Sequence, residues 1–451
     1  MSPDPATAAI EEQLAEFASE TRWRDMPLAV REYARSLTVD ALANAVAGRT
    51  AETVREYETS TTALAGPGRH AVCAGSHLSA WGATGQNAYQ MTVHTMCDVY
   101  RPALCHVTPE VVPAALAAAE LAGASGEEFL LAVALGLEVT TRTCLGLDYP
   151  AFRARGWHSP GVAGAIGAAA AAGRLLGVDT SQLNGCLGLA GAQAAGTFAA
   201  LGTVAVKFHQ ANGARAGLAA AVYASGGFSG SQHILTDADG GILRSYAGGG
   251  DPARVTAGLG ESWELSGISM RTYPAASTLQ ALVDCLLTDQ AQRAYRAGAV
   301  STVVVWLPPH AYSLGAGRWD TQLSAMQSAR FVSSATLETG YCWLDSFGPE
   351  RRSDPRLAGF ADQAVTVSLD SGLEEGAVRV RLTGPDGAID LARDFPHGDS
   401  RDPLTGTEVA AKAERCLAAG LSESQCQQAL SALTRLEHAS TVTDLTSAVT
   451  V

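Results

Sequence analysis

The chain has 451 residues, a formal net charge of −14, 17% charged residues and 47% hydrophobic residues. A chain of this length usually exceeds one hydrophobic core, so we expect two domains. An acidic chain without a visible basic patch cannot readily displace counterions from phosphates, which argues against a nucleic-acid partner. The low charge content predicts that part of the surface is covered in a homo-oligomer.

The apolar stretches predict neither a membrane span nor a secretory signal. Those such as 161–172 are rich in Ala and Gly and are interrupted, so none reaches the roughly 20 strongly apolar residues that a span requires. Residues 1–12 carry Asp and Glu without the basic region that begins a signal peptide. We therefore expect a cytoplasmic protein with no membrane partner.

From Ala8 to about Leu265 the apolar residues recur at helical spacings and are interrupted at Gly- or Pro-containing joints. Ala and Gly in these segments allow helices to approach closely, which predicts a dense all-helical layer. The clearest predicted helices are 111–121, 126–145, 161–176 and 211–224.

Beyond Trp263 the pattern changes to β-branched runs, which predict strands at 301–307, 364–369 and 377–382. A helix is expected over 278–297, a less regular polar stretch over 310–356, and helical spacing returns in the tail, 407–445. The predicted fold is mainly α. A large all-helical domain spans residues 1–265 and is completed by 400–451, and a smaller α+β domain spans 266–399.

The nine cysteines are scattered and include no Cys-x-x-Cys pair, which is typical of reduced thiols. This pattern also argues against an iron–sulfur cluster, because clustered thiolate ligands are expected there. His94, Cys97, Cys105 and His106 lack zinc-ligand spacing, so no metal site is predicted. No Ser nucleophile elbow, phosphate-binding loop or dinucleotide fingerprint appears, and we expect no cofactor.

Lysine usage singles out one residue. Only Lys207 and Lys412 are lysines among the 31 basic residues, and Lys207 lies between apolar residues, two positions before His209. A partly buried amine near a helix start can pair with a carboxylate or move a proton. The alternative is a surface lysine whose stem covers apolar neighbours.

Two further segments carry groups that handle protons. His158 follows Arg153 and Arg155 and directly precedes a predicted helix, whose N-terminal amides favour an anion. Asp98, Tyr100 and His106 occur within nine positions ahead of the helix expected at 111. A capping or packed histidine and a purely polar loop are the respective structural alternatives.

Several segments together resemble the MmgE/PrpD family over almost the whole chain. They begin at His106 (HVTPEVVPAALAAAE), Arg155 (RGWHSP), Lys207 (KFHQANGARAG), Gly227 (GFSG), Arg271 (RTYP) and Phe395 (FPHGDSRDPL). The resemblance implies a large all-helical domain formed by both chain ends, a smaller α+β, lid-like domain, and a homodimer. It also implies that His106 and His158 are catalytic or substrate-binding, that Lys207 is the family's characteristic lysine, and that Arg271 replaces a second lysine.

The chain also departs from the family pattern. Met96-Cys-Asp-Val-Tyr stands where members usually have Asp-Phe-Asp-Asp-Thr, so only Asp98 remains of that run. Ala276 stands where family members frequently have His or Cys, and Gln280 stands where they frequently have His. Arg271 can grip a carboxylate through its fork but stays charged, so it cannot act as a base.

The family includes 2-methylcitrate dehydratase, and the resemblance predicts a cofactor-independent hydro-lyase for a hydroxylated di- or tricarboxylate of secondary metabolism. Dehydration needs a base for the proton next to a carboxylate, an acid for the hydroxyl, and cations for the carboxylates. The hypothesis makes His106, His158 and Lys207 catalytic with Asp98 and Tyr100 as orienting groups, while the predicted substrate ligands are Arg155, His209, Arg271 and Tyr273. Decarboxylation, epimerisation and binding without catalysis remain alternatives.

Overall fold

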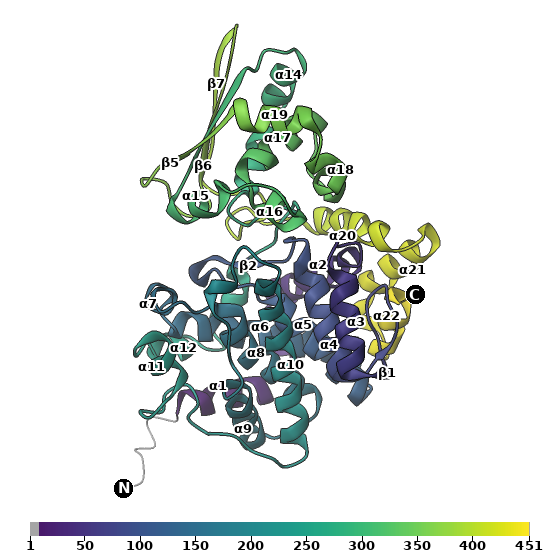
Figure 1. Ribbon diagram of the computed structural model, residues 1–451. Coiled ribbons are helices and arrows are strands. Elements are labelled where there is room, and N and C mark those ends of the chain that lie inside the picture. The colour runs from purple at the N-terminus through teal and green to yellow at the C-terminus, as the bar shows by residue number, and fades with distance from the viewer. Residues whose placement is uncertain (1–8, 451) are drawn as a thin grey trace. The chain divides into compact units, whose positions relative to one another are not determined.

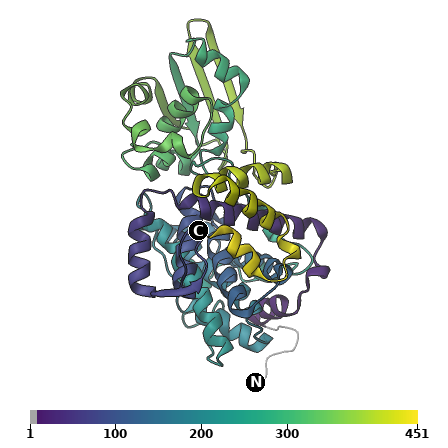
Figure 2. The ribbon, with the colours of Figure 1, turned by 90° about the vertical axis from the view of Figure 1, so that its right-hand side faces the viewer.

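The computed structural model describes residues 9–450, so most of the segment without signal-peptide features lies outside the described residues. The chain divides into two compact units. The helical unit takes the chain up to residue 92, then 97–268 and the segment from 406 onward, whereas the mixed unit takes 93–96 and 269–405. The helices of the segment from 406 onward, yellow in Figure 1 and in the turned view of Figure 2, therefore belong to the helical unit.

Helices α5, α8 and α10 form the centre of the helical unit (Figure 1). The elements of this unit are α1 Ile10–Glu20, α2 Leu28–Gly48, α3 Val54–Ala65, β1 Pro67–His70, α4 Ala80–Val93, β2 Val99–Tyr100, α5 Thr108–Ala122, α6 Gly126–Gly146, α7 Tyr149–Ala154, α8 Ser159–Leu175, α9 Thr180–Gly191, α10 Ala205–Ser225, α11 Ile242–Ala247, α12 Ala253–Thr256, α20 Gly406–Gly420, α21 Glu423–Thr434 and α22 Val442–Val449.

Glycines let the three central helices touch. A Cβ atom on Gly217 of α10 would lie 2.4 Å from the Cβ of Ala168 of α8, so a side chain there would displace the helix. Near their starts the same two helices meet where Gly161 faces His209, so α8 and α10 run parallel. Glu110, in the first turn of α5, contacts α8 at Gly164. The starts of α8 and α10 therefore lie at one end of this bundle, and the start of α5 packs against α8 within two turns of that end.

α6 is a core helix. Its length and apolar composition are sufficient for a membrane span, so the prediction that no segment reaches this length is wrong for α6. However, 94% of its most apolar window is buried inside the protein. A buried helix of this kind is common in the cores of proteins that cross no membrane, and one such helix is weak evidence for a span.

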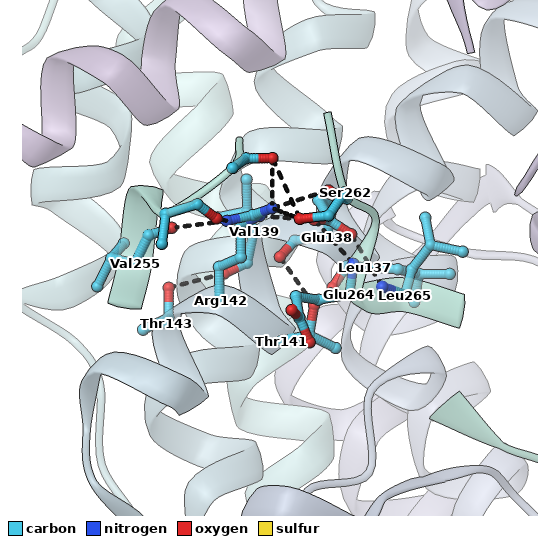
Figure 3. Close-up of polar contacts among 12 residues, drawn as sticks. Leu137, Glu138, Val139, Thr141, Arg142, Thr143, Val255, Ser262, Glu264 and Leu265 are labelled. Carbon is cyan, nitrogen blue, oxygen red and sulfur yellow. Dashed lines mark hydrogen bonds and ion pairs between the residues drawn. The ribbon is translucent and has the colours of Figure 1, made fainter. Parts of the chain in front are cut away.

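α6 carries a buried ion pair, drawn in Figure 3. Arg142 Nε donates to Glu138 Oε1 over 2.6 Å, and the guanidinium also donates to the Ser262 carbonyl over 2.8 Å. Glu138 accepts from the backbone amides of Glu264 (3.0 Å) and Leu265 (2.9 Å). Because each charge also satisfies backbone groups, the pair anchors the loop that follows α12.

The mixed unit is built on a four-stranded sheet in the order β5-β4-β6-β7. β4 pairs in parallel with β5 and antiparallel with β6, and β7 pairs antiparallel with β6. Figure 1 shows α17 and α19 beside these strands. The elements are β3 Ile268–Ser269 at the boundary, α13 Gln280–Leu286, α14 Asp289–Arg296, β4 Thr302–Leu307, α15 Pro309–Gly315, α16 Gln322–Gln327, α17 Ala329–Thr339, α18 Pro349–Arg352, α19 Pro355–Gln363, β5 Val365–Leu369, β6 Val378–Gly384 and β7 Gly387–Arg393.

One face of the sheet is buried, because alternate residues point inward. Val303 and Val305 of β4 are buried and pair with Leu382 and Val380 of β6, which are also buried. Arg379 and Arg381 lie between these β6 residues, point to the opposite face and are exposed to solvent. In β6 this alternation is the pattern that the sequence analysis found at 377–382.

The structure is mainly α with a small α+β part, as expected from the sequence. Several elements differ from the predictions. The helix predicted over 278–297 is two helices, because the Thr288 hydroxyl accepts from the Ala291 amide and starts α14. The stretch 310–356 contains four α-helices, the strand β7 was missed, and β1 and β2 add short strands to the helical unit.

Candidate active site

Two histidines meet where α8 and α10 begin. His158 precedes α8, and its backbone amide donates to the Gly196 carbonyl over 3.0 Å. Gly196 has φ +147°, and a Cβ there would approach the His209 ring at 3.2 Å, so this close turn favours glycine. His158 Nδ1 and His209 Nδ1 lie 3.0 Å apart. One must donate and the other accept, so the two neutral rings have opposite tautomers.

Both imidazoles are neutral near pH 7. Burial lowers the pKa of His158 to about 3, and electrostatic interactions with His209, Lys207 and Arg153 add to the shift. Burial also lowers the pKa of His209. A neighbouring anion would reverse part of this shift, because an opposite charge favours the protonated ring.

Lys207 is buried in the first turn of α10, which excludes the alternative of a surface lysine. Its Nζ donates to the Thr92 hydroxyl over 3.5 Å, and the Cys97 thiol donates to the same oxygen over 3.5 Å. Because its charge lowers the pKa of His158, the amine belongs to the same cluster as the histidine pair.

Asp98 and His106 organise the start of α5. The Asp98 carboxylate accepts from the backbone amides of Val107 (2.8 Å) and Thr108 (3.0 Å), and from the Thr108 hydroxyl. His106 Nδ1 lies 2.8 Å from the Asp98 backbone carbonyl. A carbonyl only accepts, so Nδ1 carries the proton and Nε2 of the neutral ring is the basic nitrogen. Asp98 thus holds His106 through its main chain while its carboxylate caps the helix.

Tyr100 is buried, and its hydroxyl donates to Glu264 Oε2 over 2.7 Å. Burial raises its pKa, and the hydrogen bond to Glu264 adds to the shift. The ion pair in Figure 3 fixes the backbone of the same glutamate. The hydroxyl is therefore neutral and engaged at the edge of the Glu138–Arg142 cluster, and its catalytic role stays a prediction.

The two arginines before His158 differ in their surroundings. Arg155 is exposed, and its Nη1 donates to the Ala151 carbonyl over 3.1 Å. The Arg153 guanidinium lies 3.4 Å from the centre of the Phe198 ring, whose edge packs against His158 at a centroid distance of 5.7 Å. Arg153, rather than Arg155, is the guanidinium that acts electrostatically on His158.

Arg271 and Tyr273 belong to the mixed unit. Arg271 is buried, and the Tyr273 hydroxyl donates to Asp284 Oδ1 over 3.0 Å. Gln280 accepts from the amides of Thr272 and Tyr273 and donates to the carbonyls of Tyr273 and Ala275. It therefore fixes the loop that carries Arg271. The roles of Arg271 and Tyr273 as substrate ligands stay predictions.

The sequence matches two family models, one described as the MmgE/PrpD N-terminal domain over residues 12–254 and one as the MmgE/PrpD C-terminal domain over residues 273–438. The chain belongs to the MmgE/PrpD family. A cis-aconitate decarboxylase-like protein of Aspergillus oryzae is 24% identical, with 96% of this chain and 95% of the relative covered.

For other relatives the similarity extends over a smaller share of their length. Cis-aconitate decarboxylase of Aspergillus terreus is 27% identical over 64% of this chain and 61% of its own, and the human enzyme of that name is 25% identical over 71% and 70%. Membership in the MmgE/PrpD family and these relatives support a lyase-type activity.

In this MmgE/PrpD chain the structure brings His158, His209 and Lys207 together, and it places His106 at the start of the adjacent helix. Among residues 9–450, no three His, Cys, Asp or Glu side chains are grouped as metal ligands. The sequence named both Arg153 and Arg155 but selected Arg155 as the substrate ligand, because two arginines separated by one residue cannot be told apart by pattern. It missed Glu110, which the sequence presents as an ordinary helix-start glutamate.

Proposed function

We propose that the protein is a cofactor-independent lyase that decarboxylates an unsaturated tricarboxylate of the cis-aconitate type. The observation that carries the proposal is the pair of neutral histidines, His158 and His209, beside the buried amine of Lys207. The names of the relatives supply the substrate class, since those proteins are called cis-aconitate decarboxylases.

The surroundings suit a polyanion. Helices α8 and α10 run parallel and begin beside His158 and Lys207, so the partial positive charges of both helix starts favour an anion there. The Lys207 ammonium and the Arg153 guanidinium add positive charges that act on the surroundings of His158. A carboxylate replaces the water that such groups would otherwise bind, and charge-assisted hydrogen bonds to it are roughly twice as strong as neutral ones.

Decarboxylation suits the neutral histidines better than dehydration does. When a carboxylate one carbon from a double bond leaves as CO₂, its bonding electrons move to the far carbon, which then takes a proton. This step needs a proton donor and no strong base. Because burial lowers the pKa of His158 to about 3, that ring is a weak base in the free protein. Lys207 is the proposed proton donor.

Dehydration of a hydroxy acid is the second candidate, and His106 favours it. Its Nδ1 proton is engaged by the Asp98 carbonyl, which leaves Nε2 as a base. The two reactions share the electron-rich carbon next to a carboxylate and differ in whether CO₂ or water leaves.

We also propose a homodimer in the cytoplasm. Exposed apolar side chains lie at the end of α10 and just after it, at Val222, Tyr223 and Phe228. The rings of Tyr223 and Phe228 lie 6.0 Å apart and form one patch. Light scattering tests the dimer: we expect twice the chain mass, and a monomer for Tyr223→Glu with Phe228→Glu.

Proton NMR in D₂O tests the function. We expect cis-aconitate to yield new vinylic protons, released CO₂ and a product with deuterium at the carbon that receives the electron pair. A citrate- or 2-methylcitrate-type acid that yields an alkene without CO₂ would instead establish dehydration.

The control is Lys207→Met, which keeps the size of the side chain and removes its proton. We expect it to abolish CO₂ release while Lys412→Met, a change of the other buried lysine, leaves turnover in the folded protein. Binding of these acids without any reaction would show that the chain is a binding protein.

A further inference from the structure

The hydrogen bond between His158 and His209 joins two rings into one titrating unit. Their Nδ1 atoms lie 3.0 Å apart. In the neutral pair one ring donates from Nδ1 and keeps a basic Nε2, while the other ring accepts at Nδ1 and carries its proton on Nε2. A proton added to the basic Nε2 leaves the Nδ1–H···Nδ1 bond in place and makes it charge-assisted. The pair can therefore carry one positive charge without losing its hydrogen bond.

Positive charges from two neighbouring helices face the pair. His158 is buried and His209 is half-buried. Lys207 of α10 and Arg153 of α7 act electrostatically on His158 and help to lower its pKa. A proton added to the rings would meet these like charges in a site that little water reaches. The pair therefore stays neutral near pH 7 as long as no anion is bound.

The other side chains packed around His158 offer no counter-charge. Glu110 of α5 packs against Gly164 of α8, the helix that His158 precedes. Burial raises the pKa of Glu110 well above its ordinary value, so this side chain is a neutral acid. The edge of the Phe198 ring packs against the imidazole of His158. An ion pair for the protonated rings must come from a ligand.

Two other histidines show the arrangement that this pair lacks. His70 Nδ1 lies 2.9 Å from a carboxylate oxygen of Glu120, and His397 Nδ1 lies 3.1 Å from one of Asp402. In the described part of the chain no carboxylate pairs with His158 or His209 in this way. These two rings have only each other, which leaves the place of an acidic partner to a bound carboxylate.

The charge of the substrate exceeds the fixed charge that faces the pair. A fully ionised tricarboxylate brings three negative charges, whereas Lys207 and Arg153 supply two positive charges around His158. A buried charge without a counter-charge costs stability, so a third positive charge is favoured once the anion is in place. The histidine pair is the group of the helical unit that can supply this charge without a rearrangement.

We propose that the His158–His209 pair takes up one proton from solvent when a polycarboxylate binds and holds it as the third positive charge of the site. This inference rests on the polycarboxylate substrate of the proposed function. The neutral pair, the anion and one solvent proton combine, and the proton returns to solvent when the product leaves. His209 acts through His158 and is a positioning residue, since its Nδ1 shares the hydrogen bond that the added charge strengthens.

Calorimetric titration with tricarballylate counts the proton. At pH 7 the acid is ionised, because its carboxyl groups have pKa values about 3 units lower. The buffer supplies any proton that the protein takes up, so the heats observed in Hepes and in imidazole buffer differ by the number of protons times the difference in their heats of ionisation. We expect about one proton per ligand bound to the wild type. Equal heats after correction for dilution, which mean no uptake, would overturn the inference.

His209→Phe keeps the ring shape and removes the Nδ1 partner of His158. We expect proton uptake to fall close to zero and the affinity for tricarballylate to fall about tenfold or more. His233→Gln removes an exposed histidine outside the site and is the matched control, for which we expect wild-type uptake and affinity. Undiminished uptake in folded His209→Phe would assign the proton to another group and contradict the inference.

Nitrogen NMR of the histidine rings in the wild type adds a readout that needs no variant. In the free protein we expect one ring of the pair protonated at Nδ1 and the other at Nε2. With tricarballylate bound, both Nε2 atoms should carry a proton while the Nδ1–H···Nδ1 bond remains. Two neutral rings in the complex would contradict the inference even if His209→Phe failed to fold.

The outcomes separate this inference from the proposed function. Proton uptake with tricarballylate in a protein that releases no CO₂ from cis-aconitate would support the inference and contradict only the proposed reaction. Release of CO₂ together with binding of tricarballylate without proton uptake would contradict only the inference. A wild type that binds neither acid would overturn the carboxylate site and the inference with it.

Discussion

Glu138 and Glu110 are two glutamates of the helical unit that are equally hidden from solvent and have opposite surroundings. Glu138 pairs with Arg142 over 2.6 Å and accepts two backbone amides, whereas neither oxygen of Glu110 has a partner in the described part of the chain. The first arrangement holds a loop in place. The second makes no side-chain hydrogen bond, and it packs against Gly164 of α8 and Gly213 of α10. Burial alone therefore does not distinguish the two carboxyl groups; their hydrogen-bond partners do.

The largest expected effect is on stability at Arg142. Arg142→Leu leaves Glu138 as an unpaired buried charge, and we expect the free energy of unfolding to fall by about 3–5 kcal/mol in urea titrations. The double variant Glu138→Leu with Arg142→Leu should recover most of that loss, because neither charge is then left alone. A single variant as stable as the double variant would show that the pair does not anchor the loop.

Lys207→Met is expected to have the next largest effect, on catalysis rather than on stability. We expect kcat for CO₂ release to fall by about a hundredfold or more, which corresponds to about 2.7 kcal/mol in the activation barrier. Urea titration of the same variant should give nearly the wild-type free energy of unfolding. Loss of stability without loss of kcat would assign Lys207 to the structure, as Glu138 is.

The histidine pair predicts how stability depends on pH. The pKa of His158 is about 3 in the folded protein, against an ordinary value of 6.5 for the unfolded chain, so the unfolded chain binds the extra proton between these values. Stability therefore falls as pH falls through this window, by about 2 kcal/mol between pH 7 and pH 5. His158→Gln should lack this part of the pH dependence, as measured by urea titration at both pH values. An equal dependence in variant and wild type would contradict the lowered pKa.

Glu110→Met gives the smallest expected effect and the opposite sign to Arg142→Leu. We expect the free energy of unfolding to rise by about 1–3 kcal/mol, because an unsatisfied buried carboxyl is replaced by an apolar group. Thermal and urea unfolding measure it. A destabilised variant would mean that Glu110 has a stabilising partner, and the comparison with Glu138 would fail.

The sequence predicted three of the four strands of the sheet and the members of the histidine and lysine cluster for identifiable reasons. A β-branched run marks 302–307, and a lysine in a chain that has only two draws attention to Lys207. The four helices between 309 and 352 were missed because they are short, and two of them start at local caps, Thr321 and Ser328, that break the longer periodicity. Glu110 was missed because only the tertiary contacts with Gly164 and Gly213 bury it.

The two buried lysines offer the most direct test of the account. Lys412 Nζ pairs with Asp40 over 2.6 Å and joins α20 to α2, whereas Lys207 lies beside the histidine pair. Calorimetric titration with tricarballylate, a saturated tricarboxylate without the double bond needed for reaction, measures anion binding alone. We predict that wild type and folded Lys412→Met bind it with similar affinity and that Lys207→Met binds it about tenfold more weakly or worse. Unchanged affinity in Lys207→Met would contradict the assignment of the helix starts as the carboxylate site.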